Sequence, residues 1–225
     1  MRLRILAVAW LGLLGTAFAQ ENDAPAPQVQ VSQEIVHFWN NECATCHGQT
    51  GEGIEEAKAP AIAGLPDYYL LDQIAKFRQG LRKGEDDTGS GFVAEMHREA
   101  VELEDALFQQ LAIHIASLPV KRPKRTVAGD PEAGSQPYQE LCASCHGAEA
   151  QGDPVKRTPP LHAFQDWYLV EQIRRFRVGL RKPDAGHGES LQMHAMALRF
   201  PSLDEAREIA LYINSYLPGE PDAEP

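Results

Sequence analysis

The stretch Cys43-Ala-Thr-Cys-His-Gly48 occurs again as Cys142-Ala-Ser-Cys-His-Gly147, 99 residues further along the chain. The two copies keep this offset without a gap over residues 43–83 and 142–182. A repeat of this length indicates two domains of the same design. Identical residues at matched positions include Pro60/Pro159, Asp67/Asp166, Tyr69/Tyr168, Gln73/Gln172, Phe77/Phe176 and Arg82/Arg181.

The composition is that of an acidic globular protein large enough for two small domains. The chain has 225 residues, of which 43% are hydrophobic and 24% are charged. The net charge of −11 argues against sequence-independent nucleic-acid binding, which depends on Lys and Arg neutralising phosphates. No apolar run reaches the ~18 residues that a membrane span needs. Four cysteines are too few for a disulfide-rich scaffold, so they need another explanation.

Residues 1–19 have the pattern of a secretory signal peptide. Arg2 and Arg4 form the positive start, Ile5–Gly15 is a short apolar run, and Ala17–Ala19 is a small-x-small cleavage site. The alternative is an uncleaved anchor helix, which the short apolar run disfavours. We therefore expect a mature chain that begins at Gln20, has no transmembrane segment, carries a net charge of −13 and lies in the periplasm of a bacterium.

The repeat and the composition around it predict the domain boundaries. We expect a disordered lead-in at 20–31, a first domain at 32–119, a linker at 120–131, a second domain at 132–218 and a tail at 219–225. The linker is predicted to be stiff and solvated because it is rich in proline and in cations. The linker cations are Lys121, Arg122, Lys124 and Arg125. Three interpretations of them are open: they keep the linker soluble, they contact an acidic face of a neighbouring domain, or they form a site for a partner protein.

Both domains are predicted to be all-α. Apolar residues recur at helical spacing in the middle and at the end of each domain, and no convincing alternating strand pattern is present. Ser202 with Glu205 forms a capping box at the start of the last helix. The expected helices cover about 32–42, 70–81, 103–118, 169–180 and 203–217.

Cys-x-x-Cys-His is the attachment signature for c-type haem. Two thiols three positions apart can each form a thioether with one vinyl group of a haem, and the next residue places an imidazole under the iron. A thiol–disulfide motif or a zinc site is the alternative, but neither explains why His directly follows the second Cys in both copies. The sequence predicts two covalently bound haem c groups, with thioethers at Cys43, Cys46, Cys142 and Cys145 and iron ligands at His47 and His146.

Three methionines follow the cleavage site, and they are candidates for the second axial ligand. Met96 and Met193 lie at comparable distances after their haem motifs, and each precedes the last amphipathic helix of its domain. A thioether opposite an imidazole gives a low-spin, six-coordinate iron with a raised potential. Met196 is the runner-up to Met193. His97 and His194, one position after the favoured methionines, are rival ligands that would lower the potential.

Three further matched pairs are candidates for supporting roles. A proline carbonyl in the loop after the haem motif would accept the Nδ1–H of the imidazole, although a turn proline needs no such contact. An Arg at the end of the middle helix would bind a haem propionate with paired hydrogen bonds, and a Tyr in that helix would bind a propionate as well. The alternative is that these side chains lie at a solvated helix end and contact no haem. The candidates are Pro60, Pro159, Tyr69, Tyr168, Arg82 and Arg181.

Each half of the chain resembles a domain of the di-haem cytochrome c4 family. The resemblance rests on the haem motifs, the Pro-x-[Ile/Leu] loop, the Tyr-Leu…Gln-Ile…Phe-Arg-x-Gly-x-Arg helix and the late Met. The resemblance covers roughly residues 33–218. It implies two tandem class I cytochrome c domains that pack about a pseudo-two-fold axis with their haem edges facing each other. The chain departs from the pattern at Ile35, where the second copy has Gly134, and in the loop Pro159–Ala163.

The leading functional hypothesis is a periplasmic electron carrier that is not an enzyme, because both irons would have all positions filled by protein and haem. The resemblance implies a respiratory donor and a terminal acceptor such as a membrane-bound oxidase or reductase. The acidic charge favours a basic docking face on these redox proteins. The alternatives are the haem subunit of a periplasmic dehydrogenase of the flavocytochrome c type and a di-haem enzyme such as a peroxidase or a thiosulfate-oxidising cytochrome.

Overall fold

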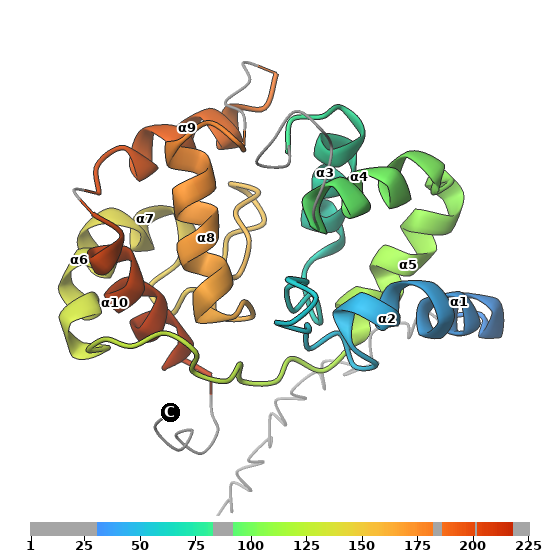
Figure 1. Cartoon of the computed structure of the whole chain (residues 1–225), viewed down its shortest axis with the longest axis horizontal. Helices are drawn as coiled ribbons and strands as arrows, with labels where there is room; N and C mark the ends of the chain where they lie inside the picture. The colour runs from blue at the N-terminus through green and yellow to red at the C-terminus, as the bar shows by residue number, and fades with distance from the viewer. Residues whose placement is uncertain (1–30, 83–91, 182–185, 201, 218–225) are drawn as a thin grey trace, which may run out of the picture. The chain divides into compact units, whose positions relative to one another are not determined.

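The computed structural model describes residues 31–82, 92–181, 186–200 and 202–217 (Figure 1). The predicted signal peptide, most of the lead-in and the tail lie outside these residues. The described elements are helical, and β-pairing among them is limited to isolated bridges. No helix in the described part is long and apolar enough to cross a membrane. The all-α prediction is confirmed.

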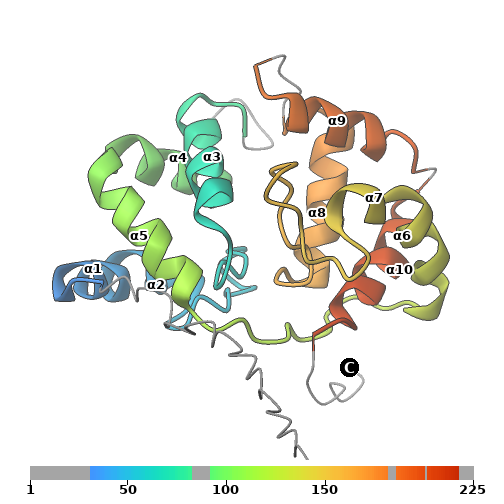
Figure 2. The ribbon, with the colours of Figure 1, turned by 180° about the vertical axis from the view of Figure 1, so that it is seen from behind.

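The elements fall into two series that follow the sequence repeat (Figures 1 and 2). We call the segment up to residue 119 the first repeat and the segment from residue 132 the second repeat. The first repeat contains α1 (Gln33–Phe38), η1 (Trp39–Cys43), α2 (Ala44–His47), α3 (Asp67–Arg78), α4 (Phe92–Glu102) and α5 (Asp105–Ser117). The second contains η2 (Glu132–Gly134), α6 (Ser135–Leu141), α7 (Ala143–His146), α8 (Asp166–Arg177), α9 (Gly188–Ala197) and α10 (Leu203–Asn214).

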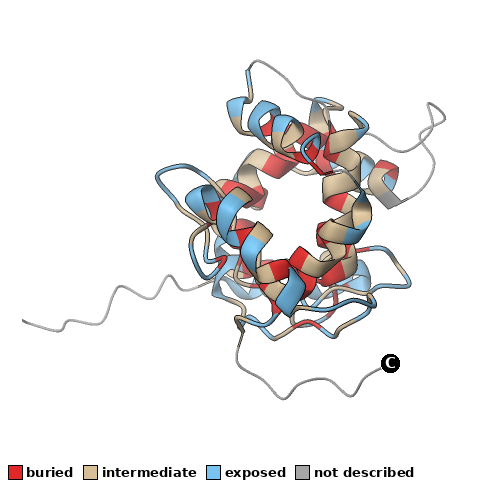
Figure 3. Ribbon diagram, turned by 90° about the vertical axis from the view of Figure 1, so that its left-hand side faces the viewer, coloured by how far each residue is buried: buried red, intermediate tan, exposed pale blue. Residues whose placement is uncertain are grey.

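Each repeat is built around one large aromatic residue just before the haem motif. Trp39 and Tyr138 occupy matched positions and are almost completely buried. Trp39 Nε1 donates to the carbonyl of Gln49 at 3.1 Å, and Tyr138 Oη donates to the carbonyl of Gly147 at 2.6 Å. These bonds satisfy the polar tips of two buried rings and tie η1 and α6 to the chain beyond each motif. Figure 3 shows buried positions on the inward sides of the helices.

The first and last helical elements of each repeat meet differently in the two copies. In the second repeat Gly134 packs against α10, and a Cβ there would lie 2.1 Å from the carbonyl oxygen of Glu208. In the first repeat Ile35 holds the matched position and is buried in the core. The first and last helices of the second repeat therefore approach each other more closely than those of the first repeat. Only glycine fits at position 134, because a side chain there would clash with α10.

The linker is largely exposed, as its composition predicts, and hydrogen bonds also anchor it to the repeats. Asp166 is fully buried and accepts hydrogen bonds from Thr126 N at 2.8 Å, Thr126 Oγ1 at 2.6 Å and Val127 N at 3.1 Å. Of the linker cations, Lys121 donates to Thr50 Oγ1 at 3.1 Å. The linker is thus held at both ends by the repeats that it joins.

Several contacts join the two repeats, and some of them are reciprocal. Arg157 lies over the ring of Tyr68, and the matched Lys58 lies over the ring of Trp167, at 5.8 and 5.5 Å from the ring centroids. Gln165 joins the repeats without a counterpart: its Oε1 accepts from Ala61 N at 2.8 Å, and its Nε2 donates to the Glu52 carbonyl at 2.9 Å. The repeats therefore meet through both symmetric and asymmetric contacts.

We expect Gly134→Ala to destabilise the protein by about 1–3 kcal/mol, because the added methyl group forces η2 and α10 apart. Denaturant unfolding followed by circular dichroism measures the change. Gly188→Ala is the matched control, because a Cβ at Gly188 meets nothing within 4 Å. Equal unfolding midpoints for the two variants would contradict the close-contact explanation.

Candidate functional site

The two Cys-x-x-Cys-His motifs form short, equivalent helical turns. In the first repeat, α1 continues into the π-turn η1, and the motif turns back through α2. Both turns end at a glycine with positive φ, +81° at Gly48 and +86° at Gly147, a conformation that other residues adopt only with strain. The four thiols are free, and the second thiol of each motif is exposed.

The histidine of each motif is oriented by a backbone carbonyl. His47 Nδ1 lies 2.8 Å from the Pro60 carbonyl, and His146 Nδ1 lies 3.1 Å from the Pro159 carbonyl. Because a carbonyl can only accept, Nδ1 carries the proton and Nε2 keeps its lone pair for a ligand. Burial lowers the pKa of both imidazoles, while these hydrogen bonds act in the opposite direction. Both rings are prepared to bind a metal as neutral ligands.

The loops that supply these carbonyls have the same backbone pairing in spite of their different sequences. Gly53 N donates to the His47 carbonyl and Gly152 N to the His146 carbonyl, both at 2.8 Å. A single bridge closes each loop, Ile54 with Ala59 and Asp153 with Thr158. The unusual loop Pro159–Ala163 thus retains the geometry of the first repeat.

A largely apolar pocket lies beside the motif of the second repeat. Its empty space, including its opening, is about 1230 Å³. Cys142, Cys145 and His146 line it together with Met193 and Met196. Thiols, a neutral imidazole, a thioether and apolar walls are the groups that fit a covalently attached haem. The lining thus places the predicted ligands around one space and retains both methionine candidates.

The zinc interpretation has no support in the described residues. No group of three or more His, Cys, Asp or Glu side chains in the described ranges is arranged to hold a metal ion. Burial also raises the pKa of Cys43 to about 11 and of Cys142 to about 12. Both thiols therefore keep their protons near neutral pH as long as no group is bound to them.

The rival histidines form other hydrogen bonds. His97 Nδ1 lies 2.6 Å from the Phe77 carbonyl, and His194 Nδ1 lies 2.6 Å from the Phe176 carbonyl. Met193 and Met196 line the pocket of the second repeat, whereas His194 is not among its lining residues. This arrangement favours methionine over histidine as the side chain that faces the pocket.

Arg82 and Arg181 come together across the boundary between the repeats. Their backbones form a bridge, and the two residues are 8% and 7% exposed. Gln73 Oε1 accepts from both guanidinium groups, each at 2.9 Å, and Tyr168 Oη accepts from Arg82 at 3.0 Å. Each guanidinium also lies over a phenylalanine ring, Arg82 at 4.2 Å and Arg181 at 4.0 Å from the ring centroid.

Among the described residues, Arg82 and Arg181 donate to uncharged groups, and Arg82 Nε is buried there without a partner. Burying a cation is costly unless an anion compensates its charge. Tyr69, Tyr168 and Arg181 also line the pocket of the second repeat. The cluster suits a carboxylate group of a ligand in that pocket.

Sequence reasoning identified the arginines and tyrosines but gave no role to the residues that join them. Gln73 and Gln172 accept from the two arginines, and their identity in the repeat is the signal that could have found them. Asp72 and Lys76 of the first repeat also line the pocket of the second. Neither residue is identical in the two copies, so the repeat gave no indication of them.

Comparison with known proteins agrees with this geometry. The family model "Cytochrome c" matches twice, over residues 35–119 and 131–216. The chain is 28% identical over 221 residues to cytochrome c4 of Azotobacter vinelandii, covering 93% of this chain and 94% of that protein. It is 32% identical over 211 residues to a thiosulfate dehydrogenase electron acceptor of Thiomonas intermedia (strain K12), covering 87% and 83%.

A solved structure of reduced recombinant cytochrome c4 from Pseudomonas stutzeri superposes with a TM-score of 0.62, covering 82% of this chain and 98% of that one. The sequence identity is 23%, so this likeness concerns the fold alone. The chain belongs to the cytochrome c family, as a cytochrome c4-like protein of two tandem domains that carries two covalently bound haem c groups and transfers electrons between redox partners.

Proposed function

We propose that the protein is a periplasmic di-haem electron carrier without an enzymatic activity of its own. The pocket of the second repeat carries this proposal, because the motif residues and the methionines of α9 line the same space. A haem iron between imidazole and thioether supplies a one-electron couple with a raised potential. An iron closed on both sides leaves no position for a substrate.

In this proposal each repeat holds one haem with its own residues. Thioethers form at Cys43 and Cys46 in the first repeat and at Cys142 and Cys145 in the second. The proximal ligands are His47 and His146, and their Nδ1–H groups are held by the carbonyls of Pro60 and Pro159. The distal ligands are Met96 on α4 and Met193 on α9, with Met196 as runner-up to Met193.

Arg82 and Arg181, with Tyr69 and Tyr168, are proposed to bind haem propionates. Two buried guanidinium groups at the boundary between the repeats favour two carboxylates nearby. Such a shared anion site would bring the propionate edges of both haems toward one place. Electrons would then enter through one domain and leave through the other.

The proposed partners are a respiratory donor and a terminal acceptor that present basic faces. The net charge of the whole chain is −11, and an acidic surface speeds association with basic partners. A membrane-bound oxidase or reductase is one acceptor that fits this chemistry. The periplasm is the compartment that the leader sequence predicts.

A second candidate function is that of a redox subunit or dedicated acceptor of a periplasmic dehydrogenase. The relative named as a thiosulfate dehydrogenase electron acceptor favours it, and a flavoprotein dehydrogenase is the other version. Purification from the native host distinguishes these roles, because a stable dehydrogenase complex brings its catalytic subunit with the cytochrome. A haem that is high-spin at neutral pH would instead favour a di-haem enzyme.

We expect Met193→Ala to remove half of the long-wavelength methionine–iron charge-transfer band of the oxidised protein, because one of two thioether ligands is lost. Met196→Ala should leave the band intact. Optical spectra normalised to the haem content provide the measurement. If the Met193 variant keeps the full band and the Met196 variant loses half of it, Met196 and not Met193 is the distal ligand.

We expect the rate of electron transfer from a cationic donor, hexaammineruthenium(II), to fall as ionic strength rises, because salt screens its attraction to the acidic surface. The rate from anionic hexacyanoferrate(II) should rise over the same range. Stopped-flow absorbance at several salt concentrations measures both. Flat responses for the two donors would remove electrostatic steering from the proposal.

A further inference from the structure

One face of α3 from the first repeat forms part of the wall of the pocket in the second repeat. Tyr69, Asp72, Gln73 and Lys76 lie on this face at positions i, i+3, i+4 and i+7, and all four line that pocket. The site that we propose for the second haem is therefore completed by the other domain.

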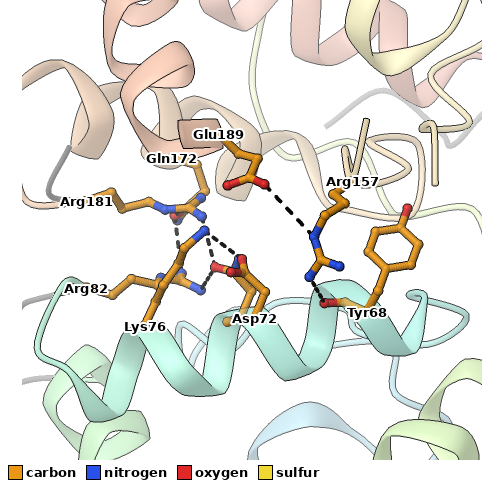
Figure 4. A network of polar contacts seen from close by, with 9 residues as sticks. Tyr68, Asp72, Lys76, Arg82, Arg157, Gln172, Arg181 and Glu189 are labelled. Carbon is orange, nitrogen blue, oxygen red and sulfur yellow. Dashed lines mark hydrogen bonds and ion pairs between the residues drawn. The ribbon is translucent and has the colours of Figure 1, made fainter. Parts of the chain in front are cut away.

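A partly buried ion pair occupies this face (Figure 4). Lys76 Nζ lies 2.6 Å from Asp72 Oδ2, with the side chains 4% and 21% exposed, respectively. Gln73 Nε2 also donates to Asp72 Oδ2 at 2.7 Å. The pair thus places one fixed cation and one fixed anion against the pocket, in a setting where solvent screens charge weakly.

We propose that Asp72 and Lys76, although they belong to the first domain, set the reduction potential of the haem in the second domain. The proposal rests on the proposed haem sites. Reduction adds one electron to the iron, so a neighbouring cation stabilises the reduced form and a neighbouring anion stabilises the oxidised form. Removing either charge alone shifts the potential in opposite directions, which a general loss of packing does not do.

The second repeat offers a matched control. Glu171 and Arg175 occupy the positions that correspond to Asp72 and Lys76, and their side chains pair at 2.6 Å. Neither lines the pocket of the second repeat, although the neighbouring Gln172 and Ile173 do. Changes to this pair should therefore leave the second haem's potential nearly unchanged.

The test is a spectroelectrochemical titration of the purified di-haem protein and of the variants Lys76→Gln, Asp72→Asn, Glu171→Gln and Arg175→Gln. We expect Lys76→Gln to lower the equilibrium constant for reduction of one haem about tenfold, which corresponds to ~59 mV, and Asp72→Asn to raise it. The proposal is overturned if both variants shift the potential in one direction, if neither does, or if the control variants shift the same haem equally.

Two marker variants assign the affected haem. Met96→His and Met193→His exchange a thioether for an imidazole and should each lower one potential. The proposal requires Lys76→Gln to act on the haem that Met193→His labels, and action on the haem that Met96→His labels overturns it. If Met96→His and Met193→His change neither reduction potential, the methionine ligands of the proposed function are wrong. Opposite shifts of one potential in Lys76→Gln and Asp72→Asn would in that case still support tuning by the ion pair.

An independent observation concerns the histidines that follow the proposed methionine ligands. His97 on α4 and His194 on α9 each place Nδ1 2.6 Å from the carbonyl of the matched phenylalanine, Phe77 or Phe176, near the end of the middle helix. Each of these carbonyls also accepts from the backbone N–H of the glycine three residues on, Gly80 at 3.0 Å or Gly179 at 3.2 Å, and its second lone pair takes the imidazole. The same bond therefore joins the methionine-bearing helix to the middle helix in both repeats.

We infer that His97 and His194 are positioning residues that hold Met96 and Met193 against the iron, an inference that also rests on the proposed methionine ligands. A fixed link one residue away restricts how far the thioether can move from its place. Without the hydrogen bond from His194 to the Phe176 carbonyl, α9 remains a helix but its distance from α8 is less restricted.

The variants His194→Ala and His194→Asn test this inference. We expect His194→Ala to weaken the methionine–iron charge-transfer band of one haem and to let the reduced protein bind carbon monoxide, whereas His194→Asn restores the band because its amide can donate to the same carbonyl. His162→Ala is the control, because its Nδ1 also meets a carbonyl, that of Glu149 at 3.3 Å, on an exposed contact.

An unchanged band and no carbon monoxide binding in His194→Ala overturn the inference, as does an equal effect of His162→Ala. Met193→Ala separates this result from a wrong ligand assignment. If Met193→Ala leaves the band intact, the ligand assignment has failed; if it halves the band while His194→Ala does not change it, only the positioning role has failed.

Discussion

The hydrogen bond between the motif imidazole and a loop carbonyl is the constraint on which both sites depend. It fixes the ring that follows the second cysteine and leaves Nε2 free, at 2.8 Å in one repeat and 3.1 Å in the other. The acceptor is a main-chain atom, so the loop sequence can vary as long as its backbone path is kept. The loops after His47 and His146 show this, because their side chains differ while their backbone bonds agree.

Size explains why so much of the second repeat faces its pocket. A domain of about 85 residues buries little apolar surface by itself. In the second repeat, residues from the middle helix, the methionine helix and the last helix all line one space, including Phe176, Met193 and Ile209. A covalently held porphyrin would thus supply much of the core, and the protein groups that bind it also stabilise the fold.

The sequence predicted the helical fold and the residues of each motif, because residue spacing and helical periodicity are local signals and both occur in each copy of the repeat. The spacing of Pro60 after His47 is a property of one loop, and helical periodicity is a property of one segment. Roles that depend on the neighbouring repeat were not visible. Asp67 and Asp166 are identical in the alignment, but Asp67 is exposed, while Asp166 is fully buried and binds the linker. The linker passes one aspartate and not the other, which no local pattern records.

The boundary between the repeats combines symmetry with asymmetry, and this combination bears on electron transfer. Ring contacts and buried arginines occur in matched pairs, as a duplicated domain would provide. Gln165 has no such counterpart, because the matched residue is Pro66, whose ring cannot form the two amide bonds. The ion pairs differ too, with Lys76 in one copy and Arg175 in the other. Two identical haem sites would share an electron equally, so a preferred direction must come from differences of this kind. Gln165 and Lys76 are such differences, and one domain presents each of them to the other.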